Sequence, residues 1–268
     1  MSYKLYSTKS ALSHNLSQWD QRTLDKELES LDTRMLTESI MRYLPANSRV
    51  IEGGCGLGAW CEWLKRHGHS VVGIEYFKEV VDQAKMLSPA VDIQQGDILK
   101  LDFPDDSFDS YVSLGVIEHF EEGPGQALNE MHRVLKDEGL AFVTVPYENR
   151  IRNLIVHPLR SLLKLIQNLS GKETYFWEYR YTKKELADAL SSAGFKVLHV
   201  GYDDYIPEEK LRHIGIWADF FFLRGNRNIS FSLNPLGLLL LKIMRMLPDG
   251  VHSAGILIIA KAVKVKSG

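Results

Sequence analysis

The chain has 268 residues, of which 45% are apolar and 25% are charged, as in an ordinary globular protein long enough to bury a large core. Its formal net charge of −2 excludes a global attraction to nucleic acid or to anionic membranes, so any basic surface must be local.

The first predicted element is a helical segment over residues 22–44, in which apolar residues recur at helical spacing until Pro45. Beyond it, short β-rich runs alternate with helices. Strands are predicted at 50–52, 71–75, 91–95, 108–114 and 140–145. Helices are predicted between the first two strands, ending at about Arg66, and at 78–87 and 125–135. This alternation is typical of parallel βαβ units.

After Pro146 the pattern changes. One more helix and strand are predicted at 183–193 and 195–201, and a last strand at 255–263. Residues 147–181 and 204–252 are interpreted as insertions, the first with a helical run at 157–169 begun by Pro158. We therefore predict an α/β fold: a seven-stranded, mostly parallel sheet with helices on both faces and an inserted helical lid. Residues 1–46 would form an N-terminal helical cap, and 47–268 the core with its lid insertions.

Four glycines follow the first strand directly: Gly53, Gly54, Gly56 and Gly58. A glycine-rich loop lets the backbone approach a ligand more closely than a Cβ would allow, and a tight structural turn is the alternative. The strand ends in an acid, Glu52. The frame G-x-G-x-G is not the dinucleotide fingerprint G-x-G-x-x-G.

Two further acids stand at strand ends. Glu75 ends the second strand, 17 residues after Gly58, where a carboxylate can accept both hydrogen bonds of a ribose diol. Asp97 follows the third strand and can accept from an adenine amino group. A solvated acid and a turn former, respectively, are the alternatives.

In this order the motifs resemble the class I S-adenosylmethionine-dependent methyltransferases. The resemblance rests on E-x-G-C-G-x-G, the acid ending the second strand, G-D-I, FPDDSFDSYVSLGVIEHF and EMHRVLKDEGLAFVTVP. It is closest to the small-molecule branch (methyltransferase type 11) that includes ubiquinone- and menaquinone-type enzymes, and it covers about residues 48–146 and 181–201. Gly53 stands where the family usually has an apolar residue, which is expected to loosen the loop.

The resemblance implies a Rossmann-like fold and S-adenosyl-L-methionine as cofactor. It assigns the methionine end to Glu52, Gly54, Gly56 and Gly58, the ribose to Glu75, the adenosine to Tyr76, Asp97 and Ile98, and the sulfonium region to Leu114. Arg34 lies 18 residues before Glu52, where some quinone-type relatives use an arginine for the cofactor carboxylate. A helix-surface arginine is the alternative.

Methyl transfer from a sulfonium needs alignment and desolvation rather than a covalent nucleophile. His119, just past the fourth strand at the carboxyl edge, is the candidate general base for an acceptor that loses a proton; a histidine packed at a helix start is the alternative. Glu118 is expected to be its local hydrogen-bond partner. Tyr147 and Asn149 follow the fifth strand and are expected to face the acceptor. We expect a small, apolar or aromatic acceptor, with oxygen favoured over nitrogen or carbon.

Residues 153–169 have an apolar stripe opposite basic residues. Such a helix packs as a lid, or lies on a membrane to collect a lipid or quinone acceptor.

The two cysteines, Cys55 and Cys61, form neither a disulfide framework nor a metal site and fit a reducing cytoplasm. No signal-peptide pattern opens the chain, and the apolar stretches 236–246 and 254–262 are too short to span a bilayer, so we expect a cytoplasmic location.

Three rival functions were weighed against this prediction. A nicotinamide dehydrogenase requires G-x-G-x-x-G and a second mononucleotide half, and the chain shows neither. Nucleic-acid methyltransferases that act on exocyclic amino groups resemble one another in an Asn/Asp-Pro-Pro-aromatic tetrad, where this chain has residues 113–116, S-L-G-V; no nucleic-acid partner is expected. A non-catalytic cofactor-binding or scaffold protein is compatible with the same fold.

Overall fold

A computed structural model describes residues 2–7, 23–162, 173–226 and 229–264. Its centre is a seven-stranded sheet in the order β4-β3-β2-β5-β6-β9-β8. The strands are β2 (Arg49–Gly53), β3 (Ser70–Glu75), β4 (Asp92–Gln95), β5 (Phe108–Leu114), β6 (Leu135–Pro146), β8 (Phe195–Asp203) and β9 (Gly255–Ala262). Only β9 runs against the others, pairing antiparallel with both β6 and β8. The predicted seven-stranded, mostly parallel sheet is confirmed.

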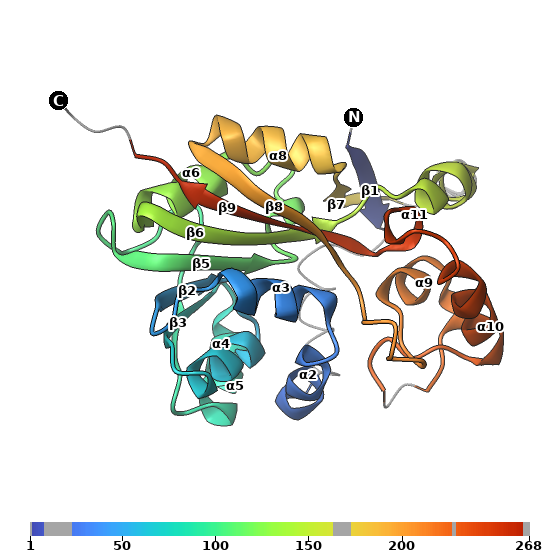
Figure 1. Cartoon of the computed structure of the whole chain (residues 1–268), viewed down its shortest axis with the longest axis horizontal. Coiled ribbons are helices and arrows are strands. Elements are labelled where there is room, and N and C mark those ends of the chain that lie inside the picture. The colour runs from blue at the N-terminus through green and yellow to red at the C-terminus, as the bar shows by residue number, and fades with distance from the viewer. Residues whose placement is uncertain (1, 8–22, 163–172, 227–228, 265–268) are drawn as a thin grey trace.

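Helices cover both faces of the sheet (Figure 1). One face packs against α6 (Gly125–Val134) and α8 (Lys183–Ser192), and the other against α3 (Met35–Tyr43), α4 (Ala59–Arg66) and α5 (Lys78–Leu87). Neighbouring side chains of a strand point to opposite faces of the sheet. Ile51 packs in the core on the side of α6 and α8, and Val50 in the core on the side of α3, α4 and α5. Strands buried on both sides therefore need apolar residues towards both faces, which explains their short continuous apolar runs.

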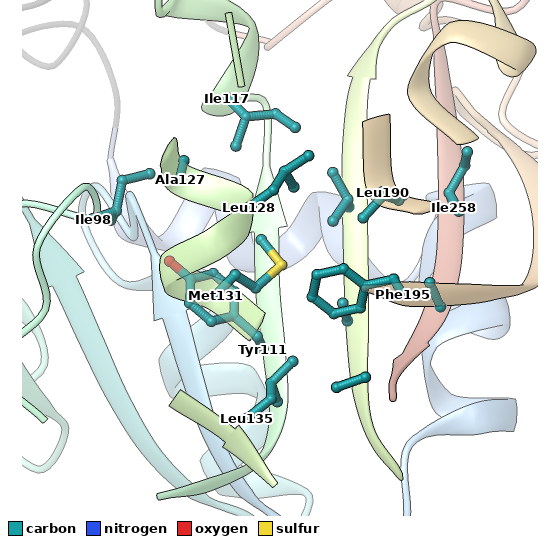
Figure 2. Close-up of a cluster of buried hydrophobic side chains, with 14 of the residues drawn as sticks. Ile98, Tyr111, Ile117, Ala127, Leu128, Met131, Leu135, Leu190, Phe195 and Ile258 are labelled. Atoms are coloured by element: carbon teal, nitrogen blue, oxygen red, sulfur yellow. The ribbon is translucent and has the colours of Figure 1, made fainter. Parts of the chain in front are cut away.

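The core between the sheet and α6 is closely packed (Figure 2). Leu128 and Met131 of α6 lie over Tyr111 of β5, and Leu190 and Phe195 close the cluster from the side of α8 and β8. All five side chains are buried. Removing each of the aliphatic ones from water contributes about 1.5–3 kcal/mol. This core holds the carboxyl ends of the parallel strands in fixed positions.

The N-terminal segment differs from the predicted helical cap. Residues 3–7 form a strand, β1 (Tyr3–Ser7), that pairs antiparallel with β7 (Tyr175–Arg180). The predicted helix at 22–44 is divided into α2 (Leu24–Leu31) and α3. The break lies at Arg34, whose backbone is extended (φ −93°, ψ 135°) and bridges to Tyr205. A tertiary contact thus overrides the helical spacing.

The first insertion holds a helix and a strand. The helix occupies residues 150–162, earlier than the predicted start at 157, and its first turns include the π-helical η2 (Arg152–Val156). Asn149 Oδ1 accepts a hydrogen bond from the Arg152 N–H at 2.8 Å, which supports the earlier start. Pro158 lies directly after the π-helical turns, and residues 163–169 of the predicted helix lie outside the described residues. The strand is β7, so this insertion is not purely helical.

The second insertion has its own small core. It contains α9 (Ile214–Asp219), η3 (Phe221–Leu223), α10 (Pro235–Met244) and α11 (Asp249–His252). The buried side chains of this core are Ile216, Leu223, Leu233, Leu241 and Met244. In the described part of the chain, no helix is both long and apolar enough to cross a bilayer.

Candidate active site

The glycine loop joins β2 to α4 and is held by β3. The N–H groups of Gly54 and Cys55 both donate to the Ile74 carbonyl, at 2.8 and 2.9 Å. A Cβ on Gly53 would lie 2.1 Å from the Tyr111 hydroxyl oxygen, and one on Gly54, where φ is +74°, would lie 2.6 Å from Val116. The ring of Tyr111 therefore fills the space that a side chain at Gly53 would take, and the expected loosening stays a prediction.

Two adjoining cavities lie at the carboxyl ends of the parallel strands. The larger has a volume of about 750 Å³ and is lined by Glu75, Tyr76, Asp97, Ile98 and His119 among the predicted residues. The smaller, of about 350 Å³, is lined by Arg34 and Glu52. Gly54 and Leu114 line both. The fold thus brings eight of the ten residues predicted for the cofactor, and His119, to one place, although they are spread over almost 90 positions of the chain.

Glu75 is buried and is held by the backbone around it. Its Oε2 accepts from the Gly56 N–H at 3.1 Å and its Oε1 from the Phe77 N–H at 3.0 Å. Gly56 therefore contributes to the site by holding this carboxylate. Gly58 precedes α4 in the left-handed conformation. Neither glycine lines either of the two cavities. Each oxygen of Glu75 keeps a second lone pair for a ligand.

Glu52 is buried at the other end of the loop. Burial raises its pKa to about 8, and the Cys61 thiol donates to its Oε2 at 2.9 Å without reversing that shift. Both Cys55 and Cys61 are free and buried. At neutral pH Glu52 is therefore mostly protonated, so it offers a donor as well as an acceptor to the smaller cavity.

Asp97 was predicted either to accept from an adenine amino group or to be a turn former, and its position is compatible with both. Its Oδ1 accepts from the Leu99 N–H at 2.9 Å, as a turn former does, and the residue also lines the larger cavity. Tyr76, beside it, is exposed with an accessible fraction of 64%, so its ring is free to cover a ligand.

Arg34 is half-buried and paired rather than a solvated helix-surface residue. Its Nη2 lies 2.6 Å from both Asp203 oxygens, and its Nε donates to Oδ1 at 3.1 Å. The guanidinium faces the smaller cavity while this pair holds it in place. Any ligand carboxylate that reaches Arg34 would share it with Asp203.

His119 ends the short helix η1 (Ile117–His119), just after β5. Its Nδ1 lies 2.7 Å from the carbonyl oxygen of Trp177 on β7. A carbonyl can only accept, so Nδ1 carries the proton, and Nε2 of the neutral ring keeps a free lone pair. The contact joins the segment that follows β5 to the first insertion.

Tyr147 and Asn149, which were predicted to face the acceptor, line neither of the two cavities described above. Asn149 is buried and donates from Nδ2 to the Ser253 carbonyl at 3.0 Å, while its Oδ1 accepts from Arg152. The Tyr147 ring packs against Tyr202 with ring centroids 5.9 Å apart. Both residues hold the chain where it leaves β6, because unpaired backbone groups there need partners.

Glu118 has a larger place in the site than the sequence suggested. It is buried, lines the smaller cavity, and its Oε2 has no hydrogen-bond partner in the described part of the protein. Burial raises its pKa to about 7. A carboxyl group so placed can exchange a proton near neutral pH.

A buried cluster of charges was missed entirely. Arg152, Arg160 and Arg180 converge on Asp219, with N–O distances of 2.7, 3.2 and 2.9 Å. Burial alone would raise the pKa of Asp219, but the three guanidiniums hold it well below its ordinary value. Arg180 lines both cavities. Its only signal in the sequence is a charged residue inside the aromatic run TYFWEYRY.

No group of three or more His, Cys, Asp or Glu among the described residues is arranged to hold a metal ion. Residues 51–143, which build the loop, the two acids and η1, match the family model of a methyltransferase domain. The chain contains a class I S-adenosylmethionine-dependent methyltransferase domain. S-adenosylmethionine is the cofactor of this class.

Relatives and solved structures agree with this family. A probable S-adenosylmethionine-dependent methyltransferase of Mycolicibacterium smegmatis is 30% identical over 178 residues, 63% of this chain and 62% of that protein. An S-adenosyl-L-methionine-dependent Diels-Alderase of Talaromyces variabilis is 31% identical over 49% of this chain and 46% of its own length. The chain thus spans less than two thirds of these relatives.

The fold of the methyltransferase extends beyond the matched residues. A solved S-adenosylmethionine-dependent methyltransferase from Mesorhizobium loti superposes with a TM-score of 0.58 at 19% identity, covering 86% of this chain and 99% of that one. At this identity the likeness concerns the fold alone, and it includes the Rossmann-like sheet predicted above.

Proposed function

We propose that this protein is an S-adenosylmethionine-dependent methyltransferase that acts in the cytoplasm on an oxygen of a small, apolar or aromatic molecule. The observation that carries the proposal is that Glu75, the glycine loop and His119 border one cavity at the sheet edge. Open α/β sheets bind ligands at this edge.

The residues present fit the cofactor. The larger cavity, of about 750 Å³, has the size of a site for a small organic molecule. A Cβ at Gly54 would intrude on the space beside Val116, so the backbone itself forms the floor. Glu75 has lone pairs left for a ribose diol, and protonated Glu52 offers a donor at the other end. Tyr76, Asp97 and Ile98 would enclose the adenine.

When bound, S-adenosylmethionine supplies a methyl group that its sulfonium activates for in-line displacement. The work of the chain is to align the acceptor and to exclude water. Trp177 and Phe120 form an apolar wall of the larger cavity beside His119. The Trp177 carbonyl fixes the ring of His119, so that Nε2 can take the proton of a phenol or alcohol acceptor.

A second candidate is binding of the cofactor without methyl transfer. The Talaromyces variabilis relative is named for a cycloaddition, and a scaffold of this fold has no need of a base. The two candidates predict the same cofactor affinity and differ in turnover with an acceptor that can lose a proton.

Calorimetric titration with S-adenosylhomocysteine tests the proposal, with NAD as the control ligand. We expect tight binding of the first and none of the second. Glu75→Ala should weaken S-adenosylhomocysteine binding more than tenfold, about 1.4 kcal/mol, since both ribose hydroxyls lose their acceptor.

Glu79→Ala, at an exposed position of α5, is the matched control and should leave the affinity unchanged. Near-normal affinity of Glu75→Ala would refute the ribose assignment. Binding of NAD in place of S-adenosylhomocysteine would overturn the proposed cofactor site.

A further inference from the structure

Large apolar side chains are exposed mainly on the two insertions. They lie on the helix at 150–162, on η3, and on α10 with the turn that follows it. The residues are Leu154, Ile155, Leu159, Leu162, Phe221, Phe222, Leu236, Leu239, Ile243, Met246 and Leu247. Exposure reaches 76% for Leu154, 77% for Phe221 and 82% for Met246. We call this set the insertion face; an exposed apolar set of this size marks an interaction surface.

The elements of the insertion face belong to one end of the molecule. Ile151, at the start of the 150–162 helix, packs against the small core that contains α9 and α10. Arg160 of the same helix donates to Asp219 of α9. In Figure 1 these elements lie together beyond the carboxyl ends of β5 and β6. The larger cavity reaches this end, where Arg160, Trp217 and Arg224 line it.

Charge is strongly segregated in the same segments. The described residues of 149–162 and 220–248 contain six Lys and Arg residues and no Asp or Glu. Asp219 offsets Arg152 and Arg160, but Arg224 and Lys242 are exposed beside the apolar side chains. The chain as a whole is slightly acidic, so this basic surface is local.

We propose that the insertion face docks on an anionic membrane and that the methyl acceptor is a lipid-like molecule taken up from it. Apolar side chains interspersed with cations, without carboxylates, suit the boundary between anionic headgroups and acyl chains. The part of the proposal that concerns the acceptor rests on the proposed methyltransferase function.

The geometry gives the docking a purpose. Arg160, Trp217 and Arg224, from the same two segments as the insertion face, line the larger cavity together with His119, and Glu75 and Asp97 line it as well. An acceptor entering from a membrane would pass Trp217 and Arg224 before reaching His119. The cofactor would exchange on the side that faces away from the bilayer.

Sedimentation of the full chain with lipid vesicles tests the inference. We expect at least tenfold stronger partitioning to vesicles of phosphatidylcholine and phosphatidylglycerol in equal parts than to phosphatidylcholine alone, with a decrease as salt rises. Leu239→Glu/Ile243→Glu, one turn apart on the exposed side of α10, should weaken the partitioning at least tenfold.

Met86→Glu/Leu87→Glu on α5 is the matched control, because both side chains are exposed but lie outside the insertion face. It should partition as the unchanged protein does. S-adenosylhomocysteine binding is measured on every variant, so that a failure of docking is distinguished from a failure of the methyltransferase site.

Absence of partitioning at low salt, with S-adenosylhomocysteine bound, would overturn the docking and leave the methyltransferase function standing. Partitioning to vesicles without S-adenosylhomocysteine binding would support the docking and overturn the proposed methyltransferase function. A dimer that Leu239→Glu/Ile243→Glu dissociates, with no binding to vesicles, would assign the face to a second copy and overturn the membrane proposal.

Discussion

Glu52 in the methyltransferase domain and Asp219 in the second insertion are both buried carboxyl groups close to the same cavities, yet their surroundings are opposite. Glu52 has the neutral thiol of Cys61 beside it, and burial raises its pKa to about 8. Asp219 has three arginines around it, which hold its pKa well below the ordinary value despite burial. The domain keeps its acid neutral, whereas the insertions keep theirs charged and paired.

The difference reflects how each region is fixed. In the methyltransferase domain the site is built from backbone groups near one another along the sheet edge, such as the Gly56 and Phe77 N–H groups on Glu75. In the insertions, side chains from the helix at 150–162, β7 and α9 meet in one ion cluster. The first arrangement tolerates loss of a side chain better than the second, because a buried charge without its partner is costly.

Asp219→Asn should have the largest effect on stability. It leaves the buried Arg152 and Arg180 and the half-buried Arg160 without the carboxylate on which they converge. The free energy of unfolding at neutral pH should therefore fall by about 3–5 kcal/mol. Urea denaturation measures this. Asp82→Asn, which removes the exposed partner of Lys78, is the control and should cost about 0.5 kcal/mol or less. An equally small loss in both variants would erase the contrast between the two regions.

The same contrast explains what could be predicted from sequence. The bounds of α5 and β5 were predicted to the residue, and the glycine loop, Glu75 and His119 were placed at one edge, because each depends on local spacing and on the strand order of a known fold. Arg180 and Asp219 were missed because their partners lie far away in the chain, where spacing carries no signal. The contacts of Tyr147 with Tyr202 and of Asn149 with Ser253 were missed for the same reason, and the predicted role of the two residues towards the acceptor stays a prediction.

His119→Ala sharpens the comparison because this residue joins the two regions. The ring comes from the methyltransferase domain, and its orientation comes from the Trp177 carbonyl of the first insertion. Turnover of a phenolic acceptor should fall about 100-fold, since the base is lost, while affinity for S-adenosylhomocysteine stays the same. Steady-state kinetics and calorimetry measure the two quantities.

His132→Ala is the control for this substitution, because His132 contacts Val263 and Phe195 and lines neither cavity. Partial recovery of His119→Ala by added imidazole would support the role as a base. Unchanged turnover on the phenolic acceptor would remove His119 from that role and favour cofactor binding without methyl transfer.

Glu52→Gln tests the other side of the comparison. In the folded protein Glu52 keeps its proton up to about pH 8, whereas an unfolded glutamate loses it near its ordinary pKa of 4.5. The folded state therefore binds more protons between these values, and the stability of the unchanged protein should decline as pH rises from about 5 to 8. Glutamine keeps the acceptor for Cys61 but has no carboxyl proton to lose. The free energy of unfolding of the variant should therefore rise by about 1 kcal/mol or more relative to the unchanged protein over that interval.

Urea denaturation at several pH values measures how the free energy of unfolding changes with pH in the two proteins. Glu79→Gln, at an exposed position, is the control and should leave this slope unchanged. Parallel slopes for Glu52→Gln and the unchanged protein would mean that Glu52 is already ionised when folded, in which case both regions hold charged carboxylates and the contrast lies only in their partners.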